Sequence, residues 1–309
     1  MSVASPSRSL VGRIARRVVV RALSAPLEGG EVELRMRAAM VLASGRVRER
    51  TRFALNELLW RRGVRAYTLR GSGRTIVLRH PMSDAWVVHE VLERHAYAPP
   101  PEVRDALADL GRPPRIADLG AHVGTTTLEL LDAWPDASIV AVEPNPDNAA
   151  LLRRMVTRNA LSDRVRIEQV AVGVAEGSIE MTGFSILSHV VRDEVETTDL
   201  WPWVAKAAGG PPPTHRVRVV DAFDLLRDVD VVKLDIEGAE WAILDDPRMA
   251  ELPARAIVLE FHWQSAPGPD ASVEVVRALS AAGYEVGDPF DEHDGVGMVW
   301  AWRRPTTAT

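Results

Sequence analysis

The segment Val231–Glu240 carries charged side chains at the end of a stretch that is otherwise apolar. It reads VVKLDIEGAE, and strand alternation places Lys233, Asp235 and Glu237 on one side. Central strands of parallel sheets are normally apolar on both faces, so charges at this position need partners. Lys233 is one of two lysines among 37 basic residues, which indicates that a compact ammonium is required there. We expect Lys233, Asp235 and Glu237 to take part in catalysis; the alternative is a purely structural Lys233–Asp235 ion pair.

A second apolar run ends in a similar way, because Glu260 and His262 alternate onto one side of Val258–Trp263. The carboxyl ends of neighbouring parallel strands form the edge where open α/β sheets bind substrates. His262 is a candidate general base, since the unperturbed pKa of histidine lies near neutrality. A divalent cation could use oxygens of Asp235, Glu237 and Glu260. Their spacing is not diagnostic, so a metal is conceivable but unsupported.

A glycine-rich turn, Asp118–Gly124, joins a predicted strand to a predicted helix and reads DLGAHVG. Such a turn brings a ligand close to the backbone N–H groups of a helix N-terminus. A dinucleotide fingerprint needs a glycine where His122 stands, and Asp118 would repel the pyrophosphate. S-adenosylmethionine lacks phosphate and carries positive charge, so an acidic turn favours it over a nicotinamide. We assign binding of this donor to Asp118, Gly120, Ala121, His122 and Gly124.

The next predicted strand ends in Glu143-Pro144-Asn145-Pro146, and Glu143 follows Gly124 by 19 residues. A carboxylate at this position can accept two hydrogen bonds from ribose hydroxyls. We therefore add Glu143, Pro144 and Asn145 to the donor site, and Asp235 as well. Gln169 and Ala171, after the third strand, are expected beside the adenine.

Strands and helices alternate from residue 102 onward, which predicts an α/β fold with a doubly wound, Rossmann-like parallel sheet. The predicted strands are Arg115–Leu119, Ser138–Glu143, Val165–Val170, Val229–Asp235, Ala256–Phe261, Tyr284–Val286 and Gly297–Trp302. The predicted helices are Thr125–Ala133, Pro146–Asn159, Ala239–Leu244 and Ala271–Ala282. The irregular stretch 184–213 is a candidate lid, in which Trp201 and Trp203 could stack on a sugar or anchor the loop.

Residues 1–100 are predicted to form a mostly helical N-terminal extension, and residues 101–309 the donor-binding domain, with the boundary near Pro99–Pro101. Residues 1–65 contain 14 Arg and 5 Glu, a balance of +9 within a chain of net charge −6. Amphipathic helices are expected near residues 10–23, 31–43 and 47–60, a hairpin around Gly71–Gly73, and a helix capped by Asp84. This basic arm could dock on the acidic domain, touch a membrane surface or form a homo-oligomer interface.

Length and composition narrow the class of protein. The chain has 309 residues, of which 46% are hydrophobic and 26% charged, as in globular proteins. We see no run long enough to cross a bilayer and no basic stripe rich in aromatic residues, so we expect neither a transmembrane segment nor a nucleic-acid partner. The sequence has no cysteine, which fits a cytoplasmic location.

With these motifs, the chain resembles the FkbM family of S-adenosylmethionine-dependent methyltransferases over about residues 84–290. The resemblance rests on DLGAHVG at Asp118, EPNP at Glu143, KLDIEGAE at Lys233 and EFH at Glu260, and more weakly on His89–Leu92 with Tyr97. It implies a class I methyltransferase sheet and O-methylation of a hydroxyl on a sugar, a glycan or a polyketide-type secondary metabolite. The family often has Asn where His122 stands.

Two other functions stay open at this point. An NAD(P)-dependent oxidoreductase could share the fold, although His122 and the acidic turn oppose it. A scaffold subunit without activity could use the basic N-terminal helices as its working surface.

Overall fold

The computed structural model describes residues 44–59, 61–80, 84–93, 95–182, 189–190, 214–293 and 296–304. The two helices expected before residue 44 and most of the candidate lid, including Trp201 and Trp203, lie outside these ranges. Within the described ranges, no helix combines the length and the apolar composition that a bilayer-spanning helix requires.

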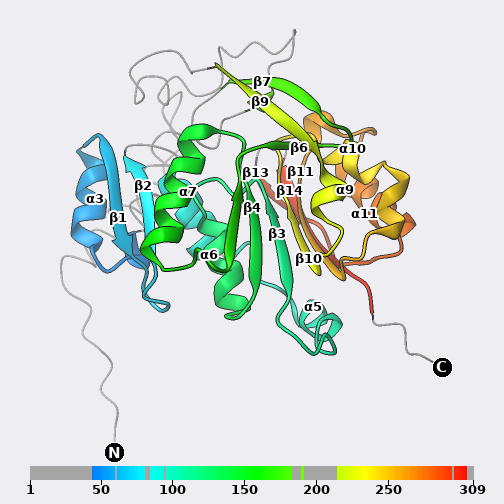
Figure 1. Cartoon of the computed structure of the whole chain (residues 1–309), viewed down its shortest axis with the longest axis horizontal. Helices are drawn as coiled ribbons and strands as arrows, with labels where there is room; N and C mark the ends of the chain where they lie inside the picture. Colours follow the sequence, from blue (N-terminus) through cyan, green and yellow to red (C-terminus); the bar gives the residue numbers. More distant parts are fainter. Residues whose placement is uncertain are drawn as a thin grey trace, which may run out of the picture.

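A doubly wound sheet forms the centre of the molecule (Figure 1). Its strands run in the order β12-β14-β11-β10-β3-β4-β5, and the pairs among β11, β10, β3, β4 and β5 are parallel, whereas β14 is antiparallel to its neighbours. The chain builds outward from β3 through β4 to β5, and then returns to β10 on the other side of β3. The strand order therefore reverses between β3 and β10, where open α/β sheets bind ligands. The bounds are β3 Arg115–Leu119, β4 Ser138–Val142, β5 Val165–Glu168, β10 Val231–Leu234, β11 Ala256–His262, β12 Glu285–Val286, β13 Phe290–His293, which pairs with β14, and β14 Val296–Trp302.

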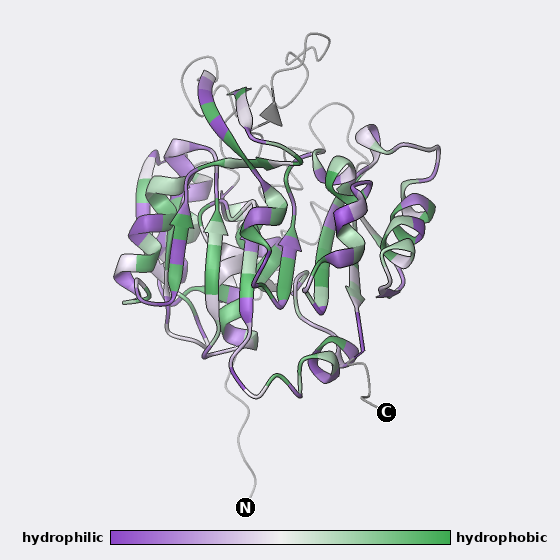
Figure 2. Ribbon diagram, turned by 45° about the vertical axis from the view of Figure 1, so that its right-hand side comes forward, coloured by the Kyte–Doolittle hydropathy of each residue, from purple (hydrophilic) through white to green (hydrophobic). Residues whose placement is uncertain are grey.

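Strand alternation divides the sheet's side chains between two hydrophobic cores. Ile116 and Val231 belong to one core, whereas their neighbours Ala117 and Val232 belong to the other. Because both faces are covered, the central strands are hydrophobic along most of their length (Figure 2). The α/β class and the doubly wound sheet predicted from the sequence are confirmed.

Helices cover both faces of this sheet. The first core includes residues of α6 and α7, and the second includes residues of α9, α10 and α11. Asn145 caps α7 by accepting the N–H groups of Asp147 and Asn148 at 2.9 and 3.3 Å. The helix bounds are α5 Pro101–Ala106, α6 Thr125–Ala133, α7 Pro146–Arg158, α9 Ala222–Leu225, α10 Glu240–Leu244 and α11 Ala271–Ala281, with 3-10 turns at η4 Pro247–Glu251 and η5 Trp263–Ser265. The strands and helices predicted from residue 102 onward are thus present, with ends that differ by a few residues.

The N-terminal described segment packs on the first of these cores. The predicted hairpin exists as β1 Gly63–Thr68 and β2 Thr75–His80, and β2 lies against α7 (Figure 1). Phe53 of helix α3 (Arg50–Leu58) and Tyr67 are buried in the same core as Leu128 and Leu152 of the sheet-covering helices. Residues on both sides of the boundary proposed near residue 100 therefore share one core; the boundary itself stays a prediction.

One local prediction in this segment needs correction, and one helix was not predicted. Asp84 is not an N-cap but the first residue of α4 (Asp84–Val87), and its carboxylate binds Arg79 instead. The chain continues as a π-helix, η2 Val88–Glu93, and after the prolines it forms α5, which the sequence analysis missed. A short 3-10 turn, η1 Ser44–Arg46, precedes α3.

A second, smaller sheet was also missed. Its strands follow the order β6-β9-β7-β8, with bounds β6 Ala171–Gly173, β7 Gly177–Thr182, β8 His189–Val190 and β9 Thr214–Asp221. In Figure 1, β7 and β9 project beyond the central sheet. In the sequence, β7 and β9 stand on either side of residues 184–213, the predicted lid.

Candidate active site

The turn after β3 touches the segment after β10 at the reversal of strand order. Gly120 has φ +80°, and a Cβ atom placed on it would lie 1.8 Å from the backbone oxygen of Asp235. Only glycine allows this approach and this backbone conformation together. The N–H groups of Gly120 and Ala121 both bond the oxygen of Val142 at the end of β4, at 3.0 and 2.9 Å. The turn is therefore held between β4 and β10.

Lys233 is the buried connection between these strand ends. Its Nζ lies 2.6 Å from the oxygen of Gly120, 3.1 Å from that of Leu119, and 3.0 Å from Oδ2 of Asp235. Burial opposes the charge, but the carboxylates of Asp235 and Asp118 outweigh it and raise the pKa of Lys233. Its side chain is only 1% exposed, so Lys233 cannot touch a substrate. Its contacts fit a role in holding Asp235 and the glycine turn, and the part that Lys233 plays in catalysis stays a prediction.

Asp118 is also buried, which corrects its predicted place on an acidic lip. Its side chain is 0% exposed; Oδ2 accepts the hydroxyl of Thr127 at 2.5 Å, and Oδ1 lies 3.6 Å from Lys233 Nζ. Burial raises the pKa of Asp118, although Lys233 and Thr127 oppose this rise. Asp118 therefore fixes Lys233 and Thr127 next to the glycine turn, and its predicted contact with the donor stays a prediction.

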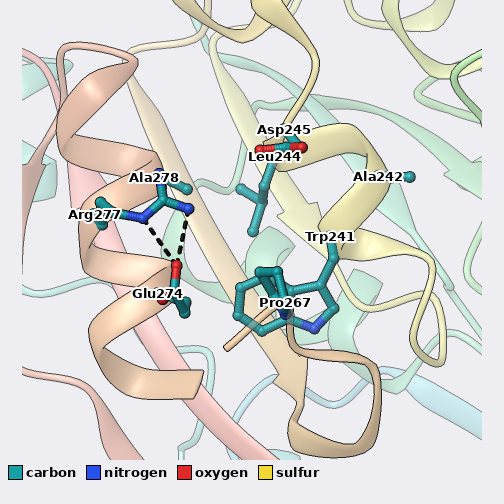
Figure 3. Close-up of a pocket in the computed structure, with 8 residues that line it drawn as sticks. All are labelled: Trp241, Ala242, Leu244, Asp245, Pro267, Glu274, Arg277 and Ala278. Atoms are coloured by element: carbon teal, nitrogen blue, oxygen red, sulfur yellow. Dashed lines mark hydrogen bonds and ion pairs between the residues drawn. The ribbon is translucent and has the colours of Figure 1, made fainter. Parts of the chain in front are cut away.

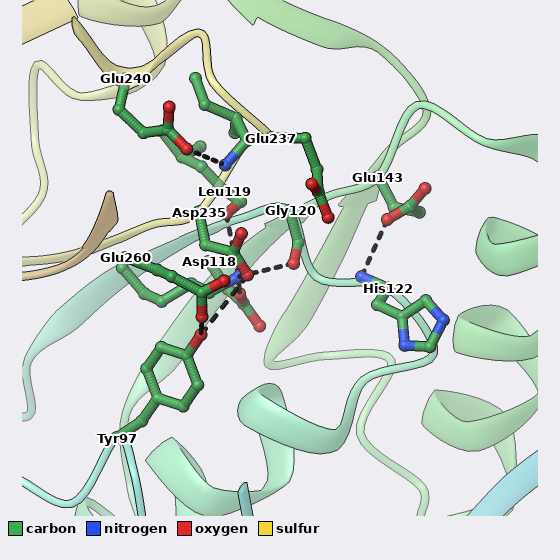
Figure 4. Close-up of polar contacts among 12 residues, drawn as sticks. Tyr97, Asp118, Leu119, Gly120, His122, Glu143, Asp235, Glu237, Glu240 and Glu260 are labelled. Atoms are coloured by element: carbon green, nitrogen blue, oxygen red, sulfur yellow. Dashed lines mark hydrogen bonds and ion pairs between the residues drawn. The ribbon is translucent and has the colours of Figure 1, made fainter. Parts of the chain in front are cut away.

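Glu143 lies at the end of β4 next to the glycine turn (Figure 4). Oε2 accepts the backbone N–H of His122 at 2.8 Å, and Oε1 accepts those of Asn145 N and Asn148 Nδ2 at 2.8 and 3.2 Å. Burial raises the pKa of Glu143, while His122 and these donors oppose the rise. A carboxylate oxygen can accept two hydrogen bonds, so Oε2 can take a further donor such as a ribose hydroxyl.

Three carboxylates and a phenol gather at the ends of β10 and β11. Tyr97 donates its hydroxyl to Oε2 of Glu260 at 2.8 Å and lies 3.4 Å from Oδ2 of Asp235 (Figure 4). Burial, reinforced by the charge of Asp235, raises the pKa of Glu260 to about 8. Asp235 keeps 21% of its side chain exposed, and that of Glu237 is 40% exposed. Asp235 and Glu237 are the carboxylates that a ligand can reach most readily in this group.

The surroundings of His262 favour its protonated form, which argues against its predicted role as a general base. Nδ1 lies 2.8 Å from Oε1 of the fully buried Glu240, and Nε2 lies 3.4 Å from Oε2 of Glu237. Burial opposes protonation, but Glu237 and Glu240 outweigh it and raise the pKa of His262 to about 12. Because a protonated imidazole cannot accept a proton, the carboxylates are the better candidates for the base.

Glu237 and Glu240, in the segment Lys233–Glu240, have different backbone and side-chain environments. Glu237 adopts a left-handed backbone with φ +57°, uncommon for a residue other than glycine. Glu240 accepts the N–H of Gly238 at 3.0 Å and fixes His262. Asp235, Glu237 and His262 each offer a ligand atom, and these atoms lie within 4.8 Å of one another, so this trio could hold a metal. It differs from the predicted trio by having His262 in place of Glu260.

The other residues predicted to bind the methyl donor either have structural roles or follow β5. Gly124 has φ +91°, and a Cβ there would meet Met155 of α7 at 2.3 Å, so this glycine permits close helix packing. Pro144 is half-buried, and Asn145 is the cap of α7. Gln169 is exposed after β5 and accepts a hydrogen bond from Arg153 at 2.8 Å, and Ala171 is buried at the start of β6.

A separate small pocket lies between α10 and α11 (Figure 3). One wall is formed by Trp241, whose Nε1 donates to the backbone oxygen of His262 at 2.9 Å. The ion pair between Glu274 and Arg277 forms the opposite wall. The lining residues are Trp241, Ala242, Leu244, Asp245, Pro267, Glu274, Arg277 and Ala278. The candidate catalytic and donor residues instead follow β3, β4, β5, β10 and β11.

Sequence reasoning missed several residues of the site. Tyr97 entered only through the family resemblance, yet it joins Glu260 and Asp235. Arg79 and Asp84 reach His122 from the hairpin and α4, with Asp84 Oδ1 3.4 Å from His122 Nε2. No local pattern reveals such contacts, because the partners are about 40 residues or more apart in the chain.

The fold and site define a ligand-binding α/β protein of the doubly wound class, and the comparisons assign its family. Residues 118–286 match the methyltransferase FkbM domain. Since the match covers more than half of the chain, the protein belongs to the FkbM methyltransferase family.

The matches to individual proteins have low sequence identity or cover only a short part of the chain. The chain is 25% identical to methyltransferase sdnD of Sordaria araneosa over 183 residues, which are 52% of this chain and 67% of that protein. It is 40% identical to the type II methyltransferase M.XamI of Xanthomonas campestris pv. amaranthicola over 74 residues, 23% of this chain and 14% of that one. A solved structure of Aeropyrum pernix fibrillarin with natively bound S-adenosyl-L-methionine aligns with 77% of this chain and 94% of its own, at 14% identity and a TM-score of 0.36.

Proposed function

We propose that the protein transfers a methyl group from S-adenosylmethionine to a hydroxyl of an uncharged acceptor. Membership of the FkbM methyltransferase family supports methyl transfer. The observation that favours this donor is the set of carboxylates, Asp235, Glu237 and Glu260, around a glycine turn at the reversal of strand order.

The residues present fit this donor better than a dinucleotide. The donor's sulfonium and ammonium are attracted by neighbouring carboxylates, whereas a pyrophosphate is repelled by them. Glu143 retains acceptor capacity for a ribose hydroxyl, and Gly120 leaves the backbone bare at the point of closest approach. Gly120, His122 and Glu143 would hold the nucleoside, and Asp235 would face its charged end.

The same carboxylates also favour some classes of acceptor over others. Exposed carboxylates disfavour phosphorylated or carboxylated acceptors and favour neutral hydroxyl groups, for which they are hydrogen-bond acceptors. Trp263 directly follows His262 and is 45% exposed, which offers an apolar face to a ring. A sugar, a glycan or a polyketide-type metabolite fits this description.

The chain's own residues then have to align the acceptor and remove its proton. The donor supplies a methyl group on a good leaving group; the acceptor oxygen gains a bond to carbon as the carbon–sulfur bond breaks. The hydroxyl proton moves to an oxygen of Asp235, which Lys233 holds in place. Protonated His262 neutralises part of the charge and fixes the side chain of Glu237.

The test combines product analysis with a substitution. Labelled donor is incubated with neutral sugars, oligosaccharides and polyketide alcohols, and methylated products are identified by mass spectrometry. Asp235→Asn should abolish turnover, whereas donor affinity should fall only modestly, because Glu237 and Glu260 still supply negative charge beside the donor. Asp224→Asn, which removes an exposed carboxylate paired with Arg227 on α9, is the matched control and should keep full activity. Full activity in Asp235→Asn would refute the assigned base.

A further inference from the structure

A polar network connects the N-terminal hairpin with the glycine turn. It contains Arg79 of β2, Asp84 of α4, His122 of the turn, Glu143 at the end of β4, and Asn148 at the start of α7. Arg79 and Asp84 precede the segment 118–286 that matches the family domain. The network therefore brings residues from outside that segment to the proposed donor site.

The Arg79–Asp84 pair is the fixed end of this network. Asp84 is 0% exposed; its Oδ2 accepts the N–H and Nε–H of Arg79 at 2.8 and 3.0 Å, and Oδ1 accepts Nη2–H at 2.9 Å. Burial opposes the charge of Asp84, but Arg79 and His122 outweigh it and hold the pKa of Asp84 well below its ordinary value. A bidentate guanidinium–carboxylate pair of this kind fixes both direction and distance.

Two routes lead from this pair to the two oxygens of Glu143. Along the first, Arg79 Nη2 donates to Oδ1 of Asn148 at 2.6 Å, and Asn148 Nδ2 donates to Oε1 of Glu143 at 3.2 Å. Along the second, His122 Nε2 lies 3.3 Å from Arg79 Nη2 and 3.4 Å from Asp84 Oδ1, while the backbone N–H of His122 donates to Oε2 of Glu143 at 2.8 Å. Both oxygens of the carboxylate are therefore oriented by one ion pair.

His122 needs such support, because its backbone has φ +50°. Residues other than glycine rarely adopt this conformation unless their surroundings hold them in it. The side chain has a partner in either protonation state: a neutral Nε2 accepts from Arg79, and a protonated one donates to Asp84. The network thus supports a histidine at the position where the family often has Asn.

We propose that Arg79 and Asp84 are positioning residues of the donor site. They hold the His122 peptide and the Glu143 carboxylate in the geometry that binds the ribose. This inference rests on the proposed function, since it concerns affinity for the proposed donor. It makes the hairpin a part of the donor site, although the hairpin lies outside the segment that carries the family motifs.

The experiment measures donor affinity in matched variants of the full chain. Asp84→Asn removes the charge that fixes Arg79, and Asp132→Asn is the control. Asp132 of α6 forms an ion pair with Arg74 that also joins the hairpin to a sheet-covering helix, but within the described residues neither side chain is hydrogen-bonded to Glu143. Calorimetry with S-adenosylmethionine and S-adenosylhomocysteine gives Kd, and kinetics give KM for each substrate and kcat.

We expect Asp84→Asn to raise the Kd for both nucleosides roughly tenfold, as the loss of one charge-assisted hydrogen bond would. The acceptor KM and kcat at saturating donor should change much less, a split that a merely structural role would not produce. Asp132→Asn should leave the Kd unchanged. If Asp84→Asn does not fold, Asn148→Ala, which cuts the first route alone, should show the same split.

The outcomes separate this inference from the proposed function. If the unchanged protein binds neither nucleoside, the proposed donor is wrong and this inference falls with it. If the unchanged protein binds and Asp84→Asn or Asn148→Ala binds equally well, the positioning role is refuted while the proposed function stands.

Discussion

Replacing Lys233 by methionine tests whether this ammonium holds the buried carboxylates together. Methionine is similar in length and removes the charge. The variant leaves Asp118, which is 0% exposed, without its cation, and leaves the oxygens of Leu119 and Gly120 without the donor now 3.1 and 2.6 Å away. Removing one partner of a buried ion pair costs about 3–5 kcal/mol. That is a large part of the roughly 5–15 kcal/mol that stabilises a typical domain.

Equilibrium unfolding in urea measures this cost. The exposed Arg277–Glu274 pair provides a control, because Arg277→Met should cost less than about 1 kcal/mol. Adding Asp118→Asn to Lys233→Met should restore part of the stability, since the uncompensated carboxylate is then absent. The loss should also be smaller at pH 5 than at pH 8: without the ammonium, the folded-state pKa of Asp118 rises further, and stability falls as the pH increases through it. A cost below about 1 kcal/mol that Asp118→Asn does not reduce would refute the role assigned to Lys233.

Three further predictions follow from the same structure. Gly120→Ala should abolish donor binding and lower Tm, because the added Cβ would lie 1.8 Å from the backbone oxygen of Asp235. Gly71→Ala is the control: Gly71 has φ +96° and open space around it, so this variant should suffer only backbone strain. Equal Tm and equal donor affinity in the two variants would contradict the clash. Glu129→Gln should flatten the dependence of Tm on pH, because burial raises the pKa of Glu129 to about 8. In the unchanged protein, the free energy of unfolding therefore falls by up to roughly 5 kcal/mol between pH 4.5 and 8. If the variant's Tm changes as much between pH 5 and 8 as that of the unchanged protein, the role assigned to Glu129 is wrong. Dialysis against EDTA should leave turnover intact, because Lys233 and His262 already supply positive charge among the carboxylates. A loss of turnover that added Mg²⁺ restores would instead indicate a metal at Asp235, Glu237 and His262.

Elements with a strong local pattern could be predicted from the sequence. Strand β3 and helix α6 have the predicted bounds, because a short apolar run ends in the glycine turn and a helical pattern follows. The smaller sheet was not foreseen. Its strand β9 alternates polar and apolar residues over Thr214–Asp221, but its partners β6 and β7 begin about 40 residues earlier, and pairing over such a distance leaves no local signal.

The site could be predicted in its residues but not in its electrostatics. The motifs brought Asp235, Glu237 and His262 together, as the structure does. The histidine was assigned as a base from its ordinary pKa, whereas Glu240 and Glu237 hold it protonated. Likewise Lys233 and Asp118 are paired in the register of β10 on β3, and the side chains of both are buried.

Calorimetric titration of the purified protein tests the central claim most directly. If the site accepts a cationic, phosphate-free nucleoside, S-adenosylmethionine and S-adenosylhomocysteine should each bind with one-to-one stoichiometry, and NADPH should give no heat of binding. Tight binding of NADPH, together with no heat from either methionine-derived nucleoside, would contradict the account.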